Sequence, residues 1–137
     1  MADTIRTVDY YYVTVPDKPG EGLRVLEALR QAGVNLLAYS GFPSGRRSQL
    51  DFVPADGAAF KAAVKGLRLK VVGPKKAFLI DGEDRVGAVA GIMRQLAVAK
   101  INVTALDAAC AGGGRWAAIL WVKARDVKKA RATLGAA

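Results

Sequence analysis

The hydrophobic positions of the chain change their spacing at regular intervals, which predicts alternating strands and helices. Residues 8–15 are rich in β-branched and aromatic side chains, as strands are. Over residues 20–33 apolar side chains such as Leu23 and Leu29 recur at helical spacing, and Gly33 stands where a helix commonly ends. The pattern then predicts a strand at 34–39, a strand at 48–53, a helix at 58–66 and a strand at 67–72.

The second half of the chain repeats this order. We predict a strand at 76–80, a helix at 86–99, paired strands at 102–109 and 115–123, and a helix at 127–134. The sequence stops soon after the last helix, so the fourth strand of this half is missing or is supplied from elsewhere. We therefore divide the chain into a first unit at 1–73 and a second unit at 74–137, joined by a turn at 73–75.

Identical residues recur at a constant offset between the two halves. The identical pairs are Asp17/Asp84, Gly20/Gly87, Leu29/Leu96, Ala32/Ala99, Asn35/Asn102 and Ala38/Ala105. A period this long is typical of a duplicated small domain rather than of a short solenoid repeat. The doubled order β-α-β-β-α-β predicts an α+β fold of tandem ferredoxin-like units, with antiparallel sheets and helices on one face, the second unit lacking its last strand. Because many unrelated functions use that fold, function has to be argued from particular residues.

Composition removes several classes of chemistry. The chain has no histidine and one cysteine, which excludes His-based acid–base catalysis, imidazole metal ligands and the usual zinc sites. We therefore expect a binding protein and not an enzyme, without a metal or a cofactor. A lone Cys110 cannot form an internal disulfide, no apolar run is long enough to cross a membrane, and the N-terminus lacks a secretory signal. These features predict a cytoplasmic protein.

Candidate binding residues gather where the first helix of each unit begins. Asp17 and Asp84 each follow a strand, and we expect them to cap free N–H groups of the next helix. Gly20 and Gly87 fall in the first helical turn, where a missing side chain lets a ligand approach the helix end. That end offers unpaired N–H donors and a partial positive charge, which suit a carboxylate.

An asparagine begins the strand that follows each of these helices. The amides of Asn35 and Asn102 can donate to a carboxylate and accept from an ammonium group. Together with the helix starts, they predict recognition of both ends of a free amino acid. The simpler interpretation stays open, in which Asp is a cap, Gly serves packing and Asn is a turn residue.

At these residues the sequence resembles the ACT domain family, whose members are regulatory modules that bind small effectors, most often amino acids, between paired domains. The resemblance covers nearly the whole chain as strand, D-x-x-G, helix, (Val/Ile)-Asn, paired strands and helix, twice over. It implies an amino-acid effector held by Asp17, Lys18, Pro19, Gly20, Val34, Asn35, Asp84, Arg85, Val86, Gly87, Ile101 and Asn102. The missing last strand and the absence of an attached enzyme depart from the family's pattern, which leaves open what the pair regulates.

RNA binding is the alternative function. The RNA-recognition motif shares the element order, and the net charge of +9 suits an acidic partner. The third strands, 48–53 and 116–121, lack the aromatic pattern by which that motif stacks bases. The basic residues gather on or beside the second helices, where a charge run is usually a solvated face. Nucleic acid is therefore the less favoured partner.

We also expect a homodimer. A missing strand leaves a sheet edge open after Leu134, and open edges pair with whatever is available. Trp116 and Trp121 lie on the last strand pair, and large aromatic residues are enriched at interfaces. A symmetric two-fold contact is the commonest arrangement of small soluble oligomers. The alternative is a monomer whose edge is covered by the segment 67–76.

Overall fold

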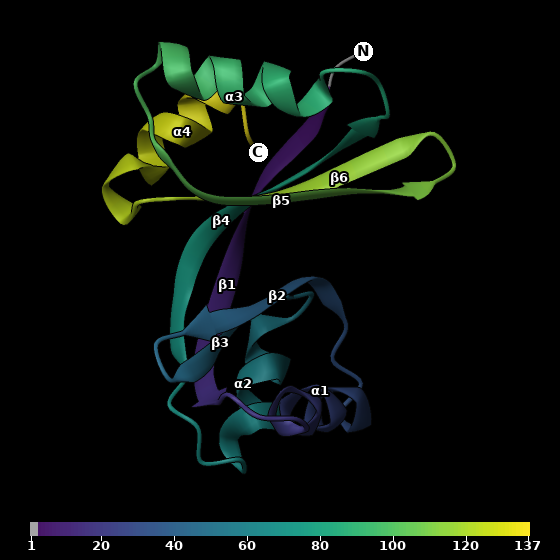
Figure 1. Cartoon of the computed structure of the whole chain (residues 1–137), viewed down its shortest axis with the longest axis vertical. Coiled ribbons are helices and arrows are strands. Elements are labelled where there is room, and N and C mark those ends of the chain that lie inside the picture. The colour runs from purple at the N-terminus through teal and green to yellow at the C-terminus, as the bar shows by residue number, and fades with distance from the viewer. Residues whose placement is uncertain (1–2) are drawn as a thin grey trace. The chain divides into compact units, whose positions relative to one another are not determined.

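The computed structural model describes residues 3–137, and its helices and paired strands lie where the sequence predicts them to within a few residues (Figure 1). The first half contains β1 (Thr4–Pro16), α1 (Glu21–Gln31), β2 (Leu36–Ser44), β3 (Arg47–Pro54) and α2 (Gly57–Lys65). The second half contains β4 (Val72–Glu83), α3 (Ala88–Val98), β5 (Val103–Gly112), β6 (Arg115–Val122), a short 3-10 helix η1 (Ala124–Asp126) and α4 (Val127–Leu134).

Two compact units make up the chain. One is Asp9–Lys75, and the other combines Lys76–Ala137 with residues 3–8. This division differs from the predicted one at the N-terminus, because β1 begins at Thr4 and its first residues lie in the second unit. The long strands β1 and β4 therefore each contribute to both units.

The start of β1 supplies the strand that the second half lacks. No strand follows α4 in the described chain, as predicted. Instead Ile5, which is 9% exposed, joins the hydrophobic core of the second unit. The N–H of Ala137 donates to the carbonyl of Ile5 at 3.0 Å, and the N–H of Thr7 donates to the carbonyl of Ala137 at 2.8 Å. The edge that was expected to be open is thus covered from within the same unit.

The strand order of each unit is that of a ferredoxin-like sheet. It is β2-β3-β1-β4 in the unit of Asp9–Lys75 and β5-β6-β4-β1 in the other. Neighbouring strands pair antiparallel, with Tyr11 opposite Phe52 in one unit and Phe78 opposite Leu120 in the other. The predicted α+β fold class of tandem βαββαβ units is confirmed.

Each unit has its own core between its sheet and its two helices. In the unit of Asp9–Lys75, Val13 and Phe52 of the sheet pack with Leu29 of α1 and Phe60 of α2. The core of the second unit contains Phe78, Ile80 and Leu120 from the sheet, Ile92 and Leu96 from α3, and Ala130 and Leu134 from α4. Because sheet residues of one face meet both helices in each unit, the helices cover the same face of their sheet, as predicted.

The element order differs from the prediction at one place. Residues 67–71 form no strand, and β4 then runs without a break through Gly73. Gly73 has a φ of 131°, and a Cβ there would lie 2.7 Å from the carbonyl oxygen of Tyr10. Its strand conformation and the close approach of β1 therefore require glycine. The predicted strand at 67–72 and the predicted turn at 73–75 are wrong, because this glycine lies inside a strand instead of ending one.

Candidate functional site

The two D-x-x-G loops join β1 to α1 and β4 to α3, and all eight of their residues are exposed. The helices begin at Gly20 and Gly87, whose φ angles of 90° and 84° are left-handed. A Cβ on either glycine would have no described atom within 4 Å. These positions therefore favour glycine for its backbone angle and not for tight packing.

Neither aspartate caps its helix, so that part of the prediction is wrong. The N-cap residues of α1 and α3 are Gly20 and Gly87, which make no side-chain cap hydrogen bond. The side chain of Asp17 accepts instead from Ser48 Oγ at 2.9 Å. Because the left-handed glycine takes the N-cap position, the aspartate stands three residues before it, too early to act as the cap.

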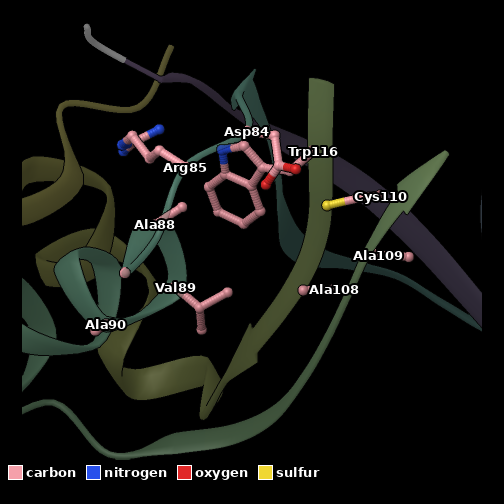
Figure 2. Close-up of a pocket in the computed structure, with 10 residues that line it drawn as sticks. Asp84, Arg85, Ala88, Val89, Ala90, Ala108, Ala109, Cys110 and Trp116 are labelled. Atoms are coloured by element: carbon pink, nitrogen blue, oxygen red, sulfur yellow. The ribbon is translucent and has the colours of Figure 1, made fainter. Parts of the chain in front are cut away.

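A cavity of about 430 Å³ lies beside the second of these loops, between α3 and β5, and we call it the α3–β5 cavity. It is lined by Asp84, Arg85, Gly87, Ala88, Val89, Ala90, Ala108, Ala109, Cys110 and Trp116. Figure 2 shows the indole of Trp116 amid this lining, with Val89 on the helix side and Cys110 on the strand side. Of the predicted site residues, Asp84, Arg85 and Gly87 are brought together here.

The cavity places groups of opposite sign close together. The first turn of α3, from Ala88 to Ala90, lines it, and no residue of that turn is acidic. An uncapped helix start presents N–H donors and a partial positive charge. The carboxylate of Asp84 lines the same space, and its hydrogen bond with Cys110 is the main cause of the raised pKa of that thiol. The lining can therefore attract an anion and a cation at neighbouring points.

Arg85 forms an ion pair with Asp3, a residue that the sequence did not single out. Its Nη1 donates to Asp3 Oδ1 and its Nη2 donates to Asp3 Oδ2, both at 2.9 Å, and Nη1 also donates to the carbonyl of Glu83 at 2.8 Å. The indole Nε1 of Trp116 donates to Asp3 Oδ1 at 3.1 Å. Chiefly through the Arg85 hydrogen bonds, the pKa of Asp3 is lowered below its ordinary value of 3.8.

The (Val/Ile)-Asn motifs lie at the opposite end of each helix. The N–H of Val34 donates to the carbonyl of Leu29, and the N–H of Ile101 donates to that of Leu96, both at 2.9 Å. These hydrogen bonds cap the C-terminal ends of α1 and α3. An 11-residue helix is about 16 Å long, which separates each Asn from the D-x-x-G loop of its own helix. Asn102, which is exposed, is accordingly not among the described residues that line the cavity.

The remaining predicted residues also lie outside the cavity. Lys18, Pro19 and Asn35 are exposed in the unit of Asp9–Lys75, and the carbonyl of Asn35 accepts from the N–H of Ala55 at 2.9 Å. Val86 is fully exposed in the second loop, whereas Ile101 is 5% exposed and belongs to the core. The missed lining residues, Ala108 to Cys110 and Trp116, come from β5 and β6. Only the pairing of β5 with β6 brings these lining residues to the second D-x-x-G loop.

The matching position in the unit of Asp9–Lys75 is filled by a side chain. At the repeat offset, Gly22, Tyr39 and Gly41 correspond to Val89, Leu106 and Ala108 of the second unit. The Oη of Tyr39 would lie 3.5 Å from a Cβ on Gly22 and 3.3 Å from one on Gly41. Its phenol thus occupies the space between the start of α1 and β2.

The start of α1 also differs in charge from the start of α3. Glu21 lies in the first turn of α1, where its carboxylate complements the helix dipole. Its Oε1 lies 3.6 Å from Arg24 Nη2. A ligand carboxylate at this end would meet a like charge. Tyr39 and Glu21 together make the first unit's site unlike the α3–β5 cavity.

Residues 3–137 contain neither a metal-binding cluster nor a membrane-spanning helix. Within that range, no group of three or more His, Cys, Asp or Glu residues is arranged to hold a metal ion. No helix in the same range is long and apolar enough to cross a membrane.

Solved structures of low sequence identity share this fold. Protein BT0572 from Bacteroides thetaiotaomicron has a TM-score of 0.82 at 16% identity, over 96% of this chain and 88% of that chain. The aspartokinase alpha and beta subunits give a TM-score of 0.68 at 18% identity, over 98% and 95%. The ligand-free regulatory subunit of aspartate kinase from Thermus thermophilus gives 0.66 at 16% identity, also over 98% and 95%.

The sequence itself matches no protein-family model and no curated protein significantly. The likeness therefore lies in the fold. The resemblance to the ACT domain family is confirmed at the level of the fold, which the chain shares with the aspartokinase subunits and with the regulatory subunit of aspartate kinase.

Proposed function

We propose that this protein is a non-catalytic regulatory module that binds a free amino acid in the α3–β5 cavity. The first turn of α3 would receive the ligand's carboxylate, and Asp84 would receive its ammonium group. The pairing of an uncapped helix start with a carboxylate in one cavity is the observation that carries the proposal. A volume of about 430 Å³ is in the range of small-molecule sites. The fold that the chain shares with a regulatory subunit of aspartate kinase supports the regulatory role.

The proposal includes one binding site per chain. The α3–β5 cavity has no acid in its helix turn and has small side chains, Ala108 and Ala109, on its strand wall. The matching space in the other unit contains the Tyr39 phenol and lies beside Glu21. The ligand therefore binds beside the second D-x-x-G loop and not beside the first, although the two loops share a sequence pattern.

A homodimer and a cytoplasmic location complete the proposal. Trp116 and Trp121, at 4% and 7% exposed, do not support an interface, because both are buried within the chain. Support comes instead from β2, an outer strand of its sheet on which Leu37 and Phe42 are exposed. Cys110 is exposed and forms no disulfide, which fits a reducing compartment.

A screen of the twenty amino acids by thermal shift, followed by calorimetry on the hits, tests the function. A ligand at one hundred times its dissociation constant should stabilise the fold by about 2.7 kcal/mol. The repeat offers a matched pair of variants. Asp84→Asn should weaken binding by about 10- to 100-fold, because it removes the charge that pairs with the ammonium group, whereas Asp17→Asn should leave affinity unchanged. The proposal fails if no amino acid at millimolar concentration raises the melting temperature.

The structure weakens the RNA-binding alternative. Base stacking needs exposed aromatic rings on the third strand of a unit, but Phe52 of β3 is fully buried and Trp116 and Trp121 of β6 are nearly so. The basic charge alone still supports it. Tight binding of short RNA with a steep dependence on salt, in place of amino-acid binding, would favour that alternative.

A further inference from the structure

Asp3 lies immediately before β1, remote in sequence from every residue that lines the α3–β5 cavity. Its side chain is 8% exposed, against 38% for Arg85. Both of its oxygens accept from the Arg85 guanidinium, and Oδ1 also accepts from the indole N–H of Trp116. A single carboxylate thus joins the start of β1 to two residues of the cavity wall.

The glycine at position 82 makes this arrangement possible. Gly82 is buried in β4, and a Cβ on it would lie 2.0 Å from Asp3 Oδ1 and 3.1 Å from Trp116 Nε1. Any other residue at this position would displace the Asp3 carboxylate from the indole. The space for the carboxylate is therefore built into the strand.

Arg85 links the Asp3 carboxylate to the loop that carries Asp84. Its Nη1 donates to the carbonyl of Glu83 as well as to Asp3. The guanidinium therefore connects the backbone just before Asp84 with the side-chain carboxylate of Asp3. Asp84 lies between Glu83 and Arg85, and its position depends on both neighbours. A bidentate arginine–carboxylate pair fixes geometry as well as charge.

We propose that Asp3 is a positioning residue of the α3–β5 cavity, which sets the affinity for the amino acid by holding Arg85 and Trp116 in place without contacting the ligand. This inference rests on the proposed function. Asp3, the residue before β1, is then a functional part of the second unit. Loss of Asp3 releases the loop that carries Asp84, and the ligand must order that loop when it binds.

The test compares affinities by calorimetry, each measured well below the melting temperature of the variant. Asp3→Asn should bind the amino acid about tenfold more weakly, the loss expected for one charge-assisted pair. Arg85→Gln should weaken binding to a similar extent, and the double variant should be no weaker than either single variant, because both act through the same contact. Glu27→Gln, which removes the exposed ion pair with Arg30 in the other unit, is the matched control and should bind normally.

A spectroscopic readout separates positioning from general loss of structure. In proton–nitrogen NMR spectra, the indole resonance of Trp116, whose N–H donates to Asp3, should move in Asp3→Asn, while that of Trp121 should stay in place. If the wild-type protein binds an amino acid and Asp3→Asn binds it equally well, the inference alone is overturned. If the wild-type protein binds none, the proposed function fails and the inference fails with it.

Discussion

Replacing Gly87 with alanine tests the reason for the glycine at the start of α3. Its φ is 84°, and a Cβ there would meet no described atom within 4 Å, so the substitution adds backbone strain without a clash. A left-handed conformation costs a residue with a Cβ about 1–2 kcal/mol. Gly91 is the matched control, because it lies inside α3, is exposed, and also has no described atom within 4 Å of a Cβ. Gly91→Ala should stabilise the fold by about 1 kcal/mol through helix propensity.

Urea unfolding measures both effects on one scale. The midpoint should fall in Gly87→Ala and rise in Gly91→Ala with an unchanged slope, which gives a difference of about 2–3 kcal/mol between the variants. Gly87→Ala should also weaken amino-acid binding, because relief of the strain moves the first turn of α3. If Gly87→Ala is as stable as the wild-type protein, the backbone argument is wrong.

Three further predictions follow from the same contacts. Calorimetry should give one amino acid per chain, and Tyr39→Ala should not abolish that site; two equal sites would contradict the role given to Tyr39. Arg85 depresses the folded-state pKa of Asp3, so the carboxylate's stabilisation is present above its ordinary pKa of 3.8 and is lost as the pH falls through the folded-state value. The stability difference between wild type and Asp3→Asn in urea should therefore be full above pH 3.8 and shrink as the pH is lowered below that value. Sedimentation equilibrium should give a mass near twice the 14.4 kDa of one chain, and Leu37→Arg should reduce it; a single-chain mass for the wild type would exclude the dimer.

Hydrophobic spacing was sufficient to predict the helices and the paired strands, but not the unbroken course of β4 or the orientation of every helix face. Leu29, predicted on the apolar side of α1, is 1% exposed, yet Leu23 is 65% exposed and Val25 is fully buried instead. The left-handed backbone of Gly20 sets the direction in which α1 begins. That direction and the packing against Phe60 of α2 determine which face of α1 meets the sheet. These contacts are tertiary, so the periodicity alone could not identify them.

The sequence predicted part of the lining of the α3–β5 cavity. The repeat identified the loop with Asp84 and Gly87, because a local motif encodes a helix start. The grouping with Asn102 neglected the length of α3, which separates the two. Asp3 carries no sequence signal, since its role arises where the chain start, the Arg85 loop and Trp116 meet in the fold.

The most direct test of the account is an amide NMR titration of the wild-type protein with the amino acid found in the screen. A bound carboxylate at the start of α3 should shift the backbone amide resonances of Ala88, Val89 and Ala90 most strongly and saturate as a single site. The matching amides of α1, from Glu21 to Leu23, should change little. Shifts that are largest in α1, or absent from Ala88–Ala90 at saturation, would contradict the placement of the ligand in the α3–β5 cavity.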